Sequence, residues 1–276
     1  MDPVENVPCD STENIPRIDP AVARKHFDRI GRFRILVIGR SNAGKTTLLQ
    51  RICNTTELPE VFNSEGKQFM TYLLCPITNC HQRGEHNIED ELVFRSNTGF
   101  IFHDSRGFEA GSEKEVKLMQ NFLTDRSATM KLERRIHAIW YCIPLTDSER
   151  PVVVAEELFF NECNTRNVPV IVVLTKADVM ELEAIGQLRE RGLTIKEARS
   201  HAQELAQQLL TDVKTRIEDQ LAGCKHNPND CMNKVNADCD SLLRCTTNAL
   251  DDMELQQLVI STQQVNFNLN IEYAIK

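Results

Sequence analysis

The segment Gly39-Arg-Ser-Asn-Ala-Gly44-Lys45-Thr46 constrains the fold of this chain more than any other feature. It fits G-x-x-x-x-G-K-[ST], begins where the apolar run FRILVI ends, and continues into the helix-like segment KTTLLQRIC. A strand, a glycine-containing turn and a helix in this order form a nest of backbone N–H groups that binds phosphate. The expected phosphate-binding residues are Gly39, Arg40, Ser41, Asn42, Ala43, Gly44, Lys45, Thr46 and Thr47.

Lys45 and Thr46 have the most specific expected roles in this loop. Lys45 is expected to bridge the β- and γ-phosphates, where it is also a catalytic candidate, and Thr46 to ligate Mg²⁺. The loop predicts phosphate binding, but it does not choose between ATP and GTP or between a kinase and a hydrolase.

From residue 33 onward, short apolar runs alternate with helical stretches, which is typical of a parallel α/β sheet. The expected strands are residues 33–38, 92–95, 100–103, 137–142, 168–174 and 257–260. The expected helices are residues 45–53, 112–130, 152–161 and 194–221, the last with an apolar stripe of three- and four-residue steps that should face a core. The sequence therefore predicts an α/β fold of three layers, a mostly parallel six-stranded sheet with helices on both faces.

Residues 1–30 differ in character from the rest of the chain. Pro3, Pro8, Pro16 and Pro20 interrupt any helix before residue 21, so these residues are expected to be a disordered tail that ends in a short helix. Residues 31–276 are expected to form one domain. Within it, the turn-rich residues 223–255 are expected to be an insertion or a lid.

The composition narrows the class of protein. The 32 Lys and Arg against 40 Asp and Glu give a net charge of −8, which argues against a chain that coats nucleic acid or an anionic membrane. No apolar run is long enough for a membrane span. The 10 cysteines are irregularly spaced and no export signal is evident, so reduced thiols and a cytoplasmic location are expected.

Two further motifs follow predicted strands. In Asp104-Ser-Arg-Gly107, Asp104 should hold a Mg²⁺-bound water and the Gly107 N–H should meet the γ-phosphate. Thr175-Lys176-Ala-Asp178 resembles the [NT]-K-x-D element of GTPases. Asp178 would accept hydrogen bonds from guanine N1–H and the 2-amino group, a donor pair that adenine lacks, while the stem of Lys176 would lie along the base. The Thr175 hydroxyl would tie loops together.

A third segment completes the expected base site. Ser261 and Thr262 follow the predicted strand 257–260 in a small polar loop. A backbone N–H of that loop is expected to contact guanine O6.

These four elements in this order resemble the translation-factor-related class of P-loop GTPases, over residues 33–276. The phosphate loop is especially similar to that of Era-like and tRNA-modification GTPases. The stretches HDSRGFEAG, IWYCIP and VPVIVVLTKAD are similar to G domain-containing proteins of mushroom-forming fungi. The resemblance implies a G domain over residues 31–276 that binds GTP or GDP with Mg²⁺.

The sequence departs from the Ras-like pattern after D-x-x-G. Phe108 stands where those proteins carry the glutamine that orients the attacking water. An activating cation could then come from a partner protein or a second subunit of a homodimer, from Arg106 in cis, or from K⁺. In potassium-activated GTPases, the asparagine that matches Asn42 helps to coordinate K⁺.

The threonine of the first switch is the least defined site residue. Thr78 and Thr71 are the candidates for a Mg²⁺ ligand that also contacts the attacking water, and Thr78 is preferred because it lies just before a predicted strand. The surrounding segment is unusually apolar for a switch, and two explanations stay open: an extra strand or a translated intron.

Two functions from different classes agree with these residues. The first is a Mg²⁺-dependent GTPase that acts as a molecular switch. The second is a GTP-dependent assembly module with little hydrolysis. An ATP-using nucleotide kinase is disfavoured, because it would need a second substrate site and would gain nothing from T-K-x-D.

Overall fold

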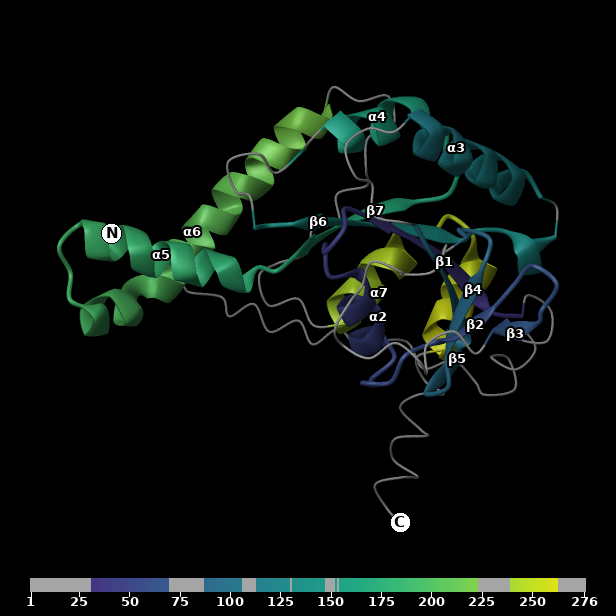
Figure 1. Ribbon diagram of the computed structural model, residues 1–276, viewed down its shortest axis with the longest axis horizontal. Helices are drawn as coiled ribbons and strands as arrows, with labels where there is room; N and C mark the ends of the chain where they lie inside the picture. Colours follow the sequence, from purple (N-terminus) through teal and green to yellow (C-terminus); the bar gives the residue numbers. More distant parts are fainter. Residues whose placement is uncertain are drawn as a thin grey trace, which may run out of the picture.

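One mixed β-sheet forms the centre of the protein (Figure 1). The computed structural model describes residues 31–69, 87–105, 113–129, 131–146, 152, 154–222 and 239–262. The seven strands of the sheet are β1 (Phe33–Gly39), β2 (Glu60–Phe62), β3 (Gln68–Phe69), β4 (Glu91–Phe94), β5 (Asn97–Asp104), β6 (Ala138–Pro144) and β7 (Val170–Thr175). Their order across the sheet is β3-β2-β4-β5-β1-β6-β7.

The sheet has a parallel part and an antiparallel part. β1 pairs in parallel with β5 and β6, and β6 pairs in parallel with β7. β4 pairs antiparallel with β5, and β2 pairs antiparallel with both β4 and β3. The carboxyl ends of β1, β5, β6 and β7 therefore meet at one edge, which is where open α/β sheets bind ligands.

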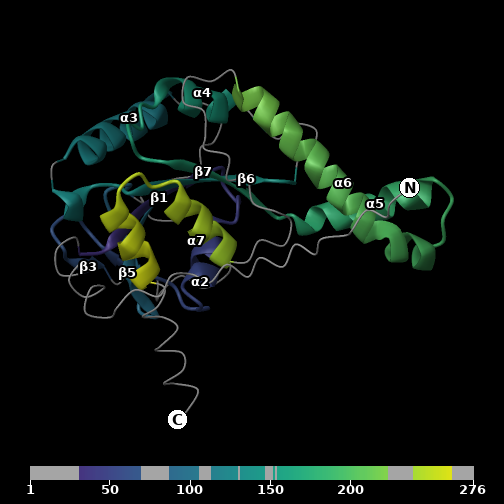
Figure 2. The same ribbon diagram turned by 180° about the vertical axis from the view of Figure 1, so that it is seen from behind.

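Helices cover both faces of the sheet (Figures 1 and 2). The labelled helices are α2 (Lys45–Ile52), α3 (Glu113–Ala128), α4 (Val154–Glu162), α5 (Asp178–Glu190), α6 (Ile195–Ala222) and α7 (Cys239–Asn248). The helices α3, α4 and α6 share one hydrophobic core with the sheet, and α2 and α7 share the other. The predicted α/β class with helices on both faces is confirmed.

β1 shows why the strands appear in the sequence as continuous apolar runs. Leu36 and Ile38 pack into the core beneath α3 and α4, whereas Ile35 and Val37 pack into the core that contains α2. All four side chains are fully buried because the strand has a helical layer on each side.

The predicted strand at residues 257–260 is wrong. Residues 253–262 are helical, and Leu258 and Val259 are buried in the core that contains α2 and α7. A short apolar run has no periodicity that distinguishes a buried strand from a buried helix turn. The sheet instead gains two short strands, β2 and β3, which lie at its antiparallel edge.

Part of the segment expected as an insertion or lid belongs to the core. Leu242 and Leu243 of α7, together with Leu250 and Leu255, are buried against the sheet. Trp140 of β6 donates a hydrogen bond from its indole N–H to the Thr246 hydroxyl at 3.0 Å, which ties α7 to the sheet. Residues 239–255 therefore do not form a lid. Residues 223–238 lie outside the described residues, as does the expected tail, residues 1–30.

The long helix predicted at residues 194–221 forms as α6, within one residue at each end. It begins with a reciprocal cap: the Thr194 N–H donates to the Glu197 carboxylate at 2.9 Å, and the Glu197 N–H donates to the Thr194 hydroxyl at 3.4 Å. The apolar stripe is confirmed as core-facing, with Val213 and Ile217 buried. The exception is Ile195, which is exposed at the start of the helix.

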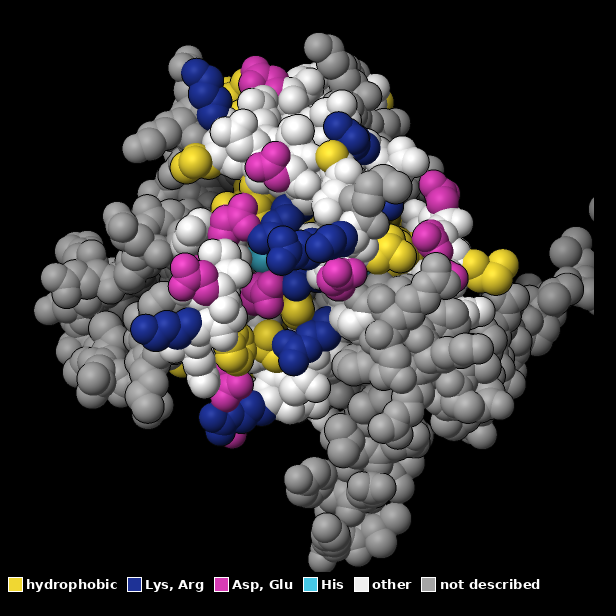
Figure 3. Space-filling view, turned by 90° about the vertical axis from the view of Figure 1, so that its right-hand side faces the viewer, with side chains coloured by type: hydrophobic (Ala, Val, Ile, Leu, Met, Phe, Trp, Pro, Cys, Tyr) yellow, Lys and Arg dark blue, Asp and Glu magenta, His cyan; other side chains and the backbone are white. Residues whose placement is uncertain are grey.

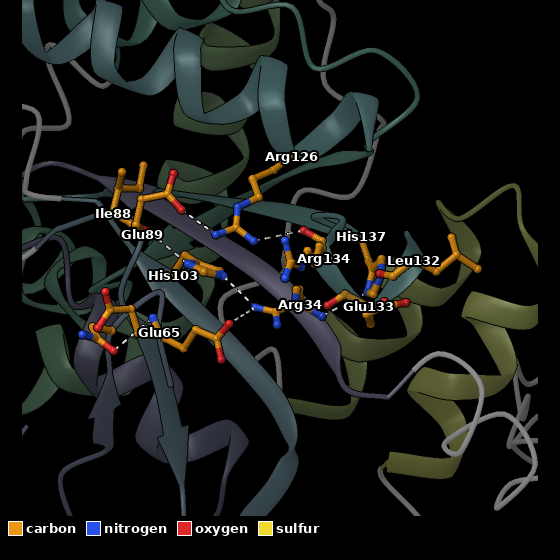
Figure 4. A network of polar contacts seen from close by, with 12 residues as sticks. Arg34, Glu65, Ile88, Glu89, His103, Arg126, Leu132, Glu133, Arg134 and His137 are labelled. Carbon is orange, nitrogen blue, oxygen red and sulfur yellow. Dashed lines mark hydrogen bonds and ion pairs between the residues drawn. The ribbon is translucent and has the colours of Figure 1, made fainter. Parts of the chain in front are cut away.

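A buried polar network lies on the α3 side of the sheet (Figure 4). Arg34 of β1 donates from its guanidinium to Glu91 at 2.7 Å and contacts the Nε2 atom of His103 at 3.2 Å. The backbone N–H of Arg34 donates to Nδ1 of His137 at 3.0 Å, and Nε2 of His137 contacts the Leu132 carbonyl at 2.9 Å. Burial lowers the pKa of His137 to about 4, so this imidazole is neutral at physiological pH.

The charged surface is mixed rather than uniformly basic. On the face drawn in Figure 3, Lys and Arg side chains gather near the centre, with Asp and Glu side chains among and around them. In the described parts of the chain, no helix combines the length and apolar character needed to cross a bilayer.

Candidate nucleotide-binding site

The phosphate loop connects β1 to α2 at the carboxyl edge of the sheet. Gly39 has a φ of 149°, and a Cβ added there would lie 2.5 Å from the Cys142 carbonyl oxygen of β6. Gly44, with φ 80°, and Asn42, with φ 59°, are in the left-handed region. Glycine is therefore required at residue 39 by close approach of β6 and favoured at residue 44 by backbone conformation.

Lys45 is held by the loop from which it extends. Its Nζ donates to the Gly39 carbonyl at 3.0 Å and to the Arg40 carbonyl at 3.1 Å. The Arg40 carbonyl also accepts the Ala43 N–H at 3.1 Å, which closes the turn. Only 9% of Lys45 is exposed. The ammonium group is thus fixed inside the loop, at the N-terminus of α2, where positive partial charge favours an anion.

Asp104 ends β5 next to this lysine. Its Oδ1 lies 4.0 Å from Lys45 Nζ. Oδ1 is itself buried and has no hydrogen-bond partner in the described part of the chain, although the whole side chain keeps 27% of its surface exposed. Burial raises the pKa of Asp104 to about 6, and the charge of Lys45 opposes that shift. A buried carboxylate oxygen that accepts no hydrogen bond from the described residues and lies beside a phosphate loop fits a ligand position for Mg²⁺ or its bound water.

The expected base-reading loop lies against the phosphate loop. The Thr175 hydroxyl donates to the Ala43 carbonyl at 2.6 Å, across 132 residues of sequence. Lys176 follows with φ 58°, and Asp178 is the first residue of α5 and is exposed. The predicted tie between the two loops is present, and Thr175 makes it in the place of the usual asparagine.

The other loop residues remain accessible. Asn42, Thr46 and Thr47 are exposed, and Ser41 is half-buried. Thr46 is therefore accessible to solvent in the first turn of α2, at the same edge of the sheet as Asp104.

The structure does not support Ser261 and Thr262 as base-contacting residues. Both are in the helix at residues 253–262, both are buried, and their hydroxyls donate back to the carbonyls of Gln257 and Leu258. Thr262 approaches Gly99, at the start of β5, whereas Asp104 ends that strand at the site. The helix therefore ends near the start of β5, away from the edge of the sheet where Asp104 lies.

Several predicted site residues lie outside the described residues. They are Gly107, Arg106 and Phe108 of the D-x-x-G segment and the first-switch candidates Thr78 and Thr71.

Two contributors to the site were not predicted from the sequence. The backbone carbonyl of Cys142 limits residue 39 to glycine. Since every residue has such a carbonyl, the sequence carries no signal for this contact. Glu156 binds the Arg40 side chain, and its only sequence signal is a carboxylate in an apolar helical segment.

The fold and the loop geometry define a P-loop nucleotide-binding protein. The profile of the 50S ribosome-binding GTPase family (MMR_HSR1) matches residues 34–176, just over half of the chain. The chain therefore belongs to this family of GTPases, as the motifs predicted.

Individual relatives agree with the family assignment. The chain is 25% identical over 159 residues to a probable GTP-binding protein EngB of Geobacillus thermodenitrificans, covering 57% of this chain and 69% of that protein. It is 24% identical over 162 residues to a probable GTP-binding protein EngB of Exiguobacterium sp., covering 58% and 70%. The predicted GTP-binding G domain is thereby confirmed.

Proposed function

We propose that this protein binds GTP with Mg²⁺ and hydrolyses it to GDP and phosphate as a molecular switch. The observation that carries the proposal is the hydrogen bond of 2.6 Å between Thr175 and Ala43, because it joins a base-reading loop and a phosphate loop into one site. A nucleotide that spans both loops contacts Lys45 at one end and Asp178 at the other.

Guanine selectivity rests on Asp178. Its carboxylate is exposed at the first turn of α5, directly after the loop that Thr175 anchors. A carboxylate there accepts from guanine N1–H and the 2-amino group, and adenine lacks that pair of donors.

The chain offers residues that fit a magnesium ion. Oδ1 of Asp104, which accepts no hydrogen bond from the residues that the structure describes, and the exposed Thr46 would hold it, with Thr78 as the proposed third residue. When bound, Mg²⁺ neutralises charge on the β- and γ-phosphates. Lys45 would add its own positive charge near these phosphates, and the Gly107 N–H is proposed to meet the γ-phosphate, so the segments that carry Thr78 and Gly107 would respond to that group.

Hydrolysis would also require a further positive charge near the phosphates, and four sources are proposed for it. Phe108 cannot orient water by hydrogen bonding, so a partner protein, a second copy of the chain, Arg106 or K⁺ beside Asn42 would have to stabilise the developing charge. Asn42 is exposed in the phosphate loop, which supports the potassium route.

Single-turnover GTP hydrolysis tests this function. The rate is expected to require Mg²⁺, and comparison of K⁺ with Na⁺ at equal ionic strength tests the potassium route. A rate that rises with protein concentration would indicate activation by a second copy. GTP binding without any hydrolysis under these conditions, together with GTP-dependent assembly, would contradict the switch enzyme and favour the assembly module.

The proposal extends the G domain over residues 31–276, since α7 and the helix at residues 253–262 supply core side chains. A cytoplasmic location is proposed because Cys53, Cys142 and Cys163 are thiols and not disulfides, as is usual in a reducing compartment.

A further inference from the structure

The side chain of Arg40 makes a contact outside the phosphate loop that its backbone helps to form. Its Nε donates to Oε1 of Glu156 at 2.7 Å, across 116 residues of sequence. Glu156 lies in the first turn of α4 and has no exposed surface, whereas the Arg40 side chain keeps 19% of its surface exposed. An arginine in a phosphate loop would be expected to meet phosphate, but this guanidinium binds a buried carboxylate.

The backbone of Arg40 supports the catalytic candidate of the loop. Its carbonyl accepts both Lys45 Nζ and the Ala43 N–H, each at 3.1 Å. A change in the position of Arg40 therefore moves an acceptor that fixes the ammonium group. Arg40 therefore connects Glu156, which its side chain contacts, with Lys45, which its carbonyl contacts.

Glu156 is buried next to a group of packed aromatic side chains. Phe159 and Phe160, one turn further along α4, are fully buried, and both pack at about 5 Å between ring centroids against Tyr141 of β6. A buried carboxylate is costly unless it is paired and hydrogen-bonded, and the pair is stronger in this environment than in water. Burial raises the pKa of Tyr141 well above its usual value, and the neighbouring charge of Glu156 raises it further.

From these contacts we infer that Glu156 is a positioning residue for the phosphate loop. Through Arg40 it fixes the carbonyl that holds Lys45, and so it sets the position of the ammonium group relative to the β- and γ-phosphates. Glu156 does not touch the nucleotide. The inference rests on the proposed GTP-binding function and adds a residue on α4 to the elements that determine it.

A positioning role differs measurably from a purely structural one. If Glu156 only stabilises the fold, its loss lowers the unfolding temperature, but the folded protein binds GTP as before. If it positions Lys45, the folded protein binds GTP more weakly and also turns over more slowly, because the lysine stabilises charge in the transition state.

The test measures GTP affinity, KM, kcat and the unfolding temperature in Glu156→Gln. Glu157→Gln is the matched control, because Glu157 is the next residue of α4, also in its first turn, and is exposed. We expect Glu156→Gln to bind GTP about tenfold more weakly, because the acceptor of the Arg40 guanidinium loses its charge, with a lower kcat. Glu157→Gln should stay within about twofold of the parent protein, as for an exposed charge.

The double variant Arg40→Gln with Glu156→Gln keeps the test decisive if Glu156→Gln alone does not fold, because it removes both charges of the pair together. The double variant should bind GTP about tenfold more weakly than the parent protein. Its affinity should be close to that of Arg40→Gln alone, because Glu156 acts through Arg40.

Three results overturn the inference. The folded Glu156→Gln protein, or the double variant, could bind GTP within twofold of the parent with an unchanged kcat. The effect of Glu156→Gln could be as large without Arg40 as with it. The parent protein could fail to bind GTP, which would overturn the proposed function as well and is recognised because every variant then behaves alike.

Discussion

At the scale of single residues, Asp178 determines which base the site accepts. Asp178→Asn is expected to weaken GTP binding about 100-fold, since the negative charge is lost and the amide N–H faces the 2-amino donor of guanine, and to improve binding of xanthosine triphosphate, whose donor and acceptor pattern suits the amide. Nucleotide titration measures both affinities.

Glu181→Gln is the matched control for Asp178→Asn. Glu181 is the other acidic residue in the first turn of α5, so its loss has the same effect on the helix dipole without removing the base contact. Unchanged GTP affinity in Asp178→Asn would show that Asp178 does not read the base.

Thr175 has a separate role, which concerns the relation between the two loops. Thr175→Val removes the hydroxyl that donates to the Ala43 carbonyl and keeps the shape of the side chain. We expect GTP and GDP to bind about fivefold more weakly, which corresponds to about 1 kcal/mol for one hydrogen bond, with the preference for guanine unchanged. Thr175→Ser should restore binding, and a serine variant as weak as the valine variant would exclude this role.

At the scale of secondary-structure elements, the loop requires a close approach of β1 and β6. Gly39→Ala would place a methyl group 2.5 Å from the Cys142 carbonyl oxygen at a φ of 149°. We expect the free energy of unfolding to fall by about 2–4 kcal/mol, from strain and overpacking together. Denaturant unfolding measures this loss.

Gly186→Ala provides the comparison for that experiment. Gly186 is inside α5, and a Cβ added there meets nothing within 4 Å. Alanine should be neutral or stabilising by up to about 1 kcal/mol in a helix interior. Equal stability of the two alanine variants would contradict the account of the loop.

The sequence predicted five strands, β1, β4, β5, β6 and β7, because they form apolar runs such as FRILVI that are covered by the two cores. The long helix α6 was predicted from its stripe, which only a helix repeats over that length. The helix at residues 253–262 was missed because its apolar run is short. That error misplaced Ser261 and Thr262, whereas the glycine–lysine loop and T-K-x-D were placed correctly because each motif has a fixed position after a strand.

The α5–α6 pair shows another limit of sequence patterning. The two helices pack against each other and extend beyond the sheet (Figures 1 and 2). On α6, Ala198 and Ala202 belong to the predicted apolar stripe and are buried, but a stripe on one helix does not show which other helix it packs against. α5 was not predicted, because Asp178 and Lys176 were assigned to a loop, although Asp178 also begins a helix.

At the scale of the whole molecule, the buried imidazole of His137 makes stability depend on pH. Its pKa is about 4 in the folded protein and 6.5 in an unfolded reference. Between these values the unfolded chain binds more protons, so the free energy of unfolding falls as the pH decreases from about 6.5 to about 4, by up to about 1.4 kcal/mol per pH unit.

His137→Gln isolates this effect. Glutamine still offers an amide donor toward the Leu132 carbonyl but does not titrate. Unfolding measured from pH 7 to pH 4 should show a shallower loss of stability in the variant than in the parent protein. Parallel pH profiles for the two proteins would show that His137 is protonated as readily when folded as when unfolded.

The most direct test of the whole account is equilibrium titration of the purified protein with GTP and ATP in the presence of Mg²⁺. The account predicts micromolar or tighter binding of GTP and at least about 100-fold weaker binding of ATP, since adenine cannot donate to Asp178. Equal affinities for the two nucleotides, or no binding of GTP at micromolar concentration, would contradict it.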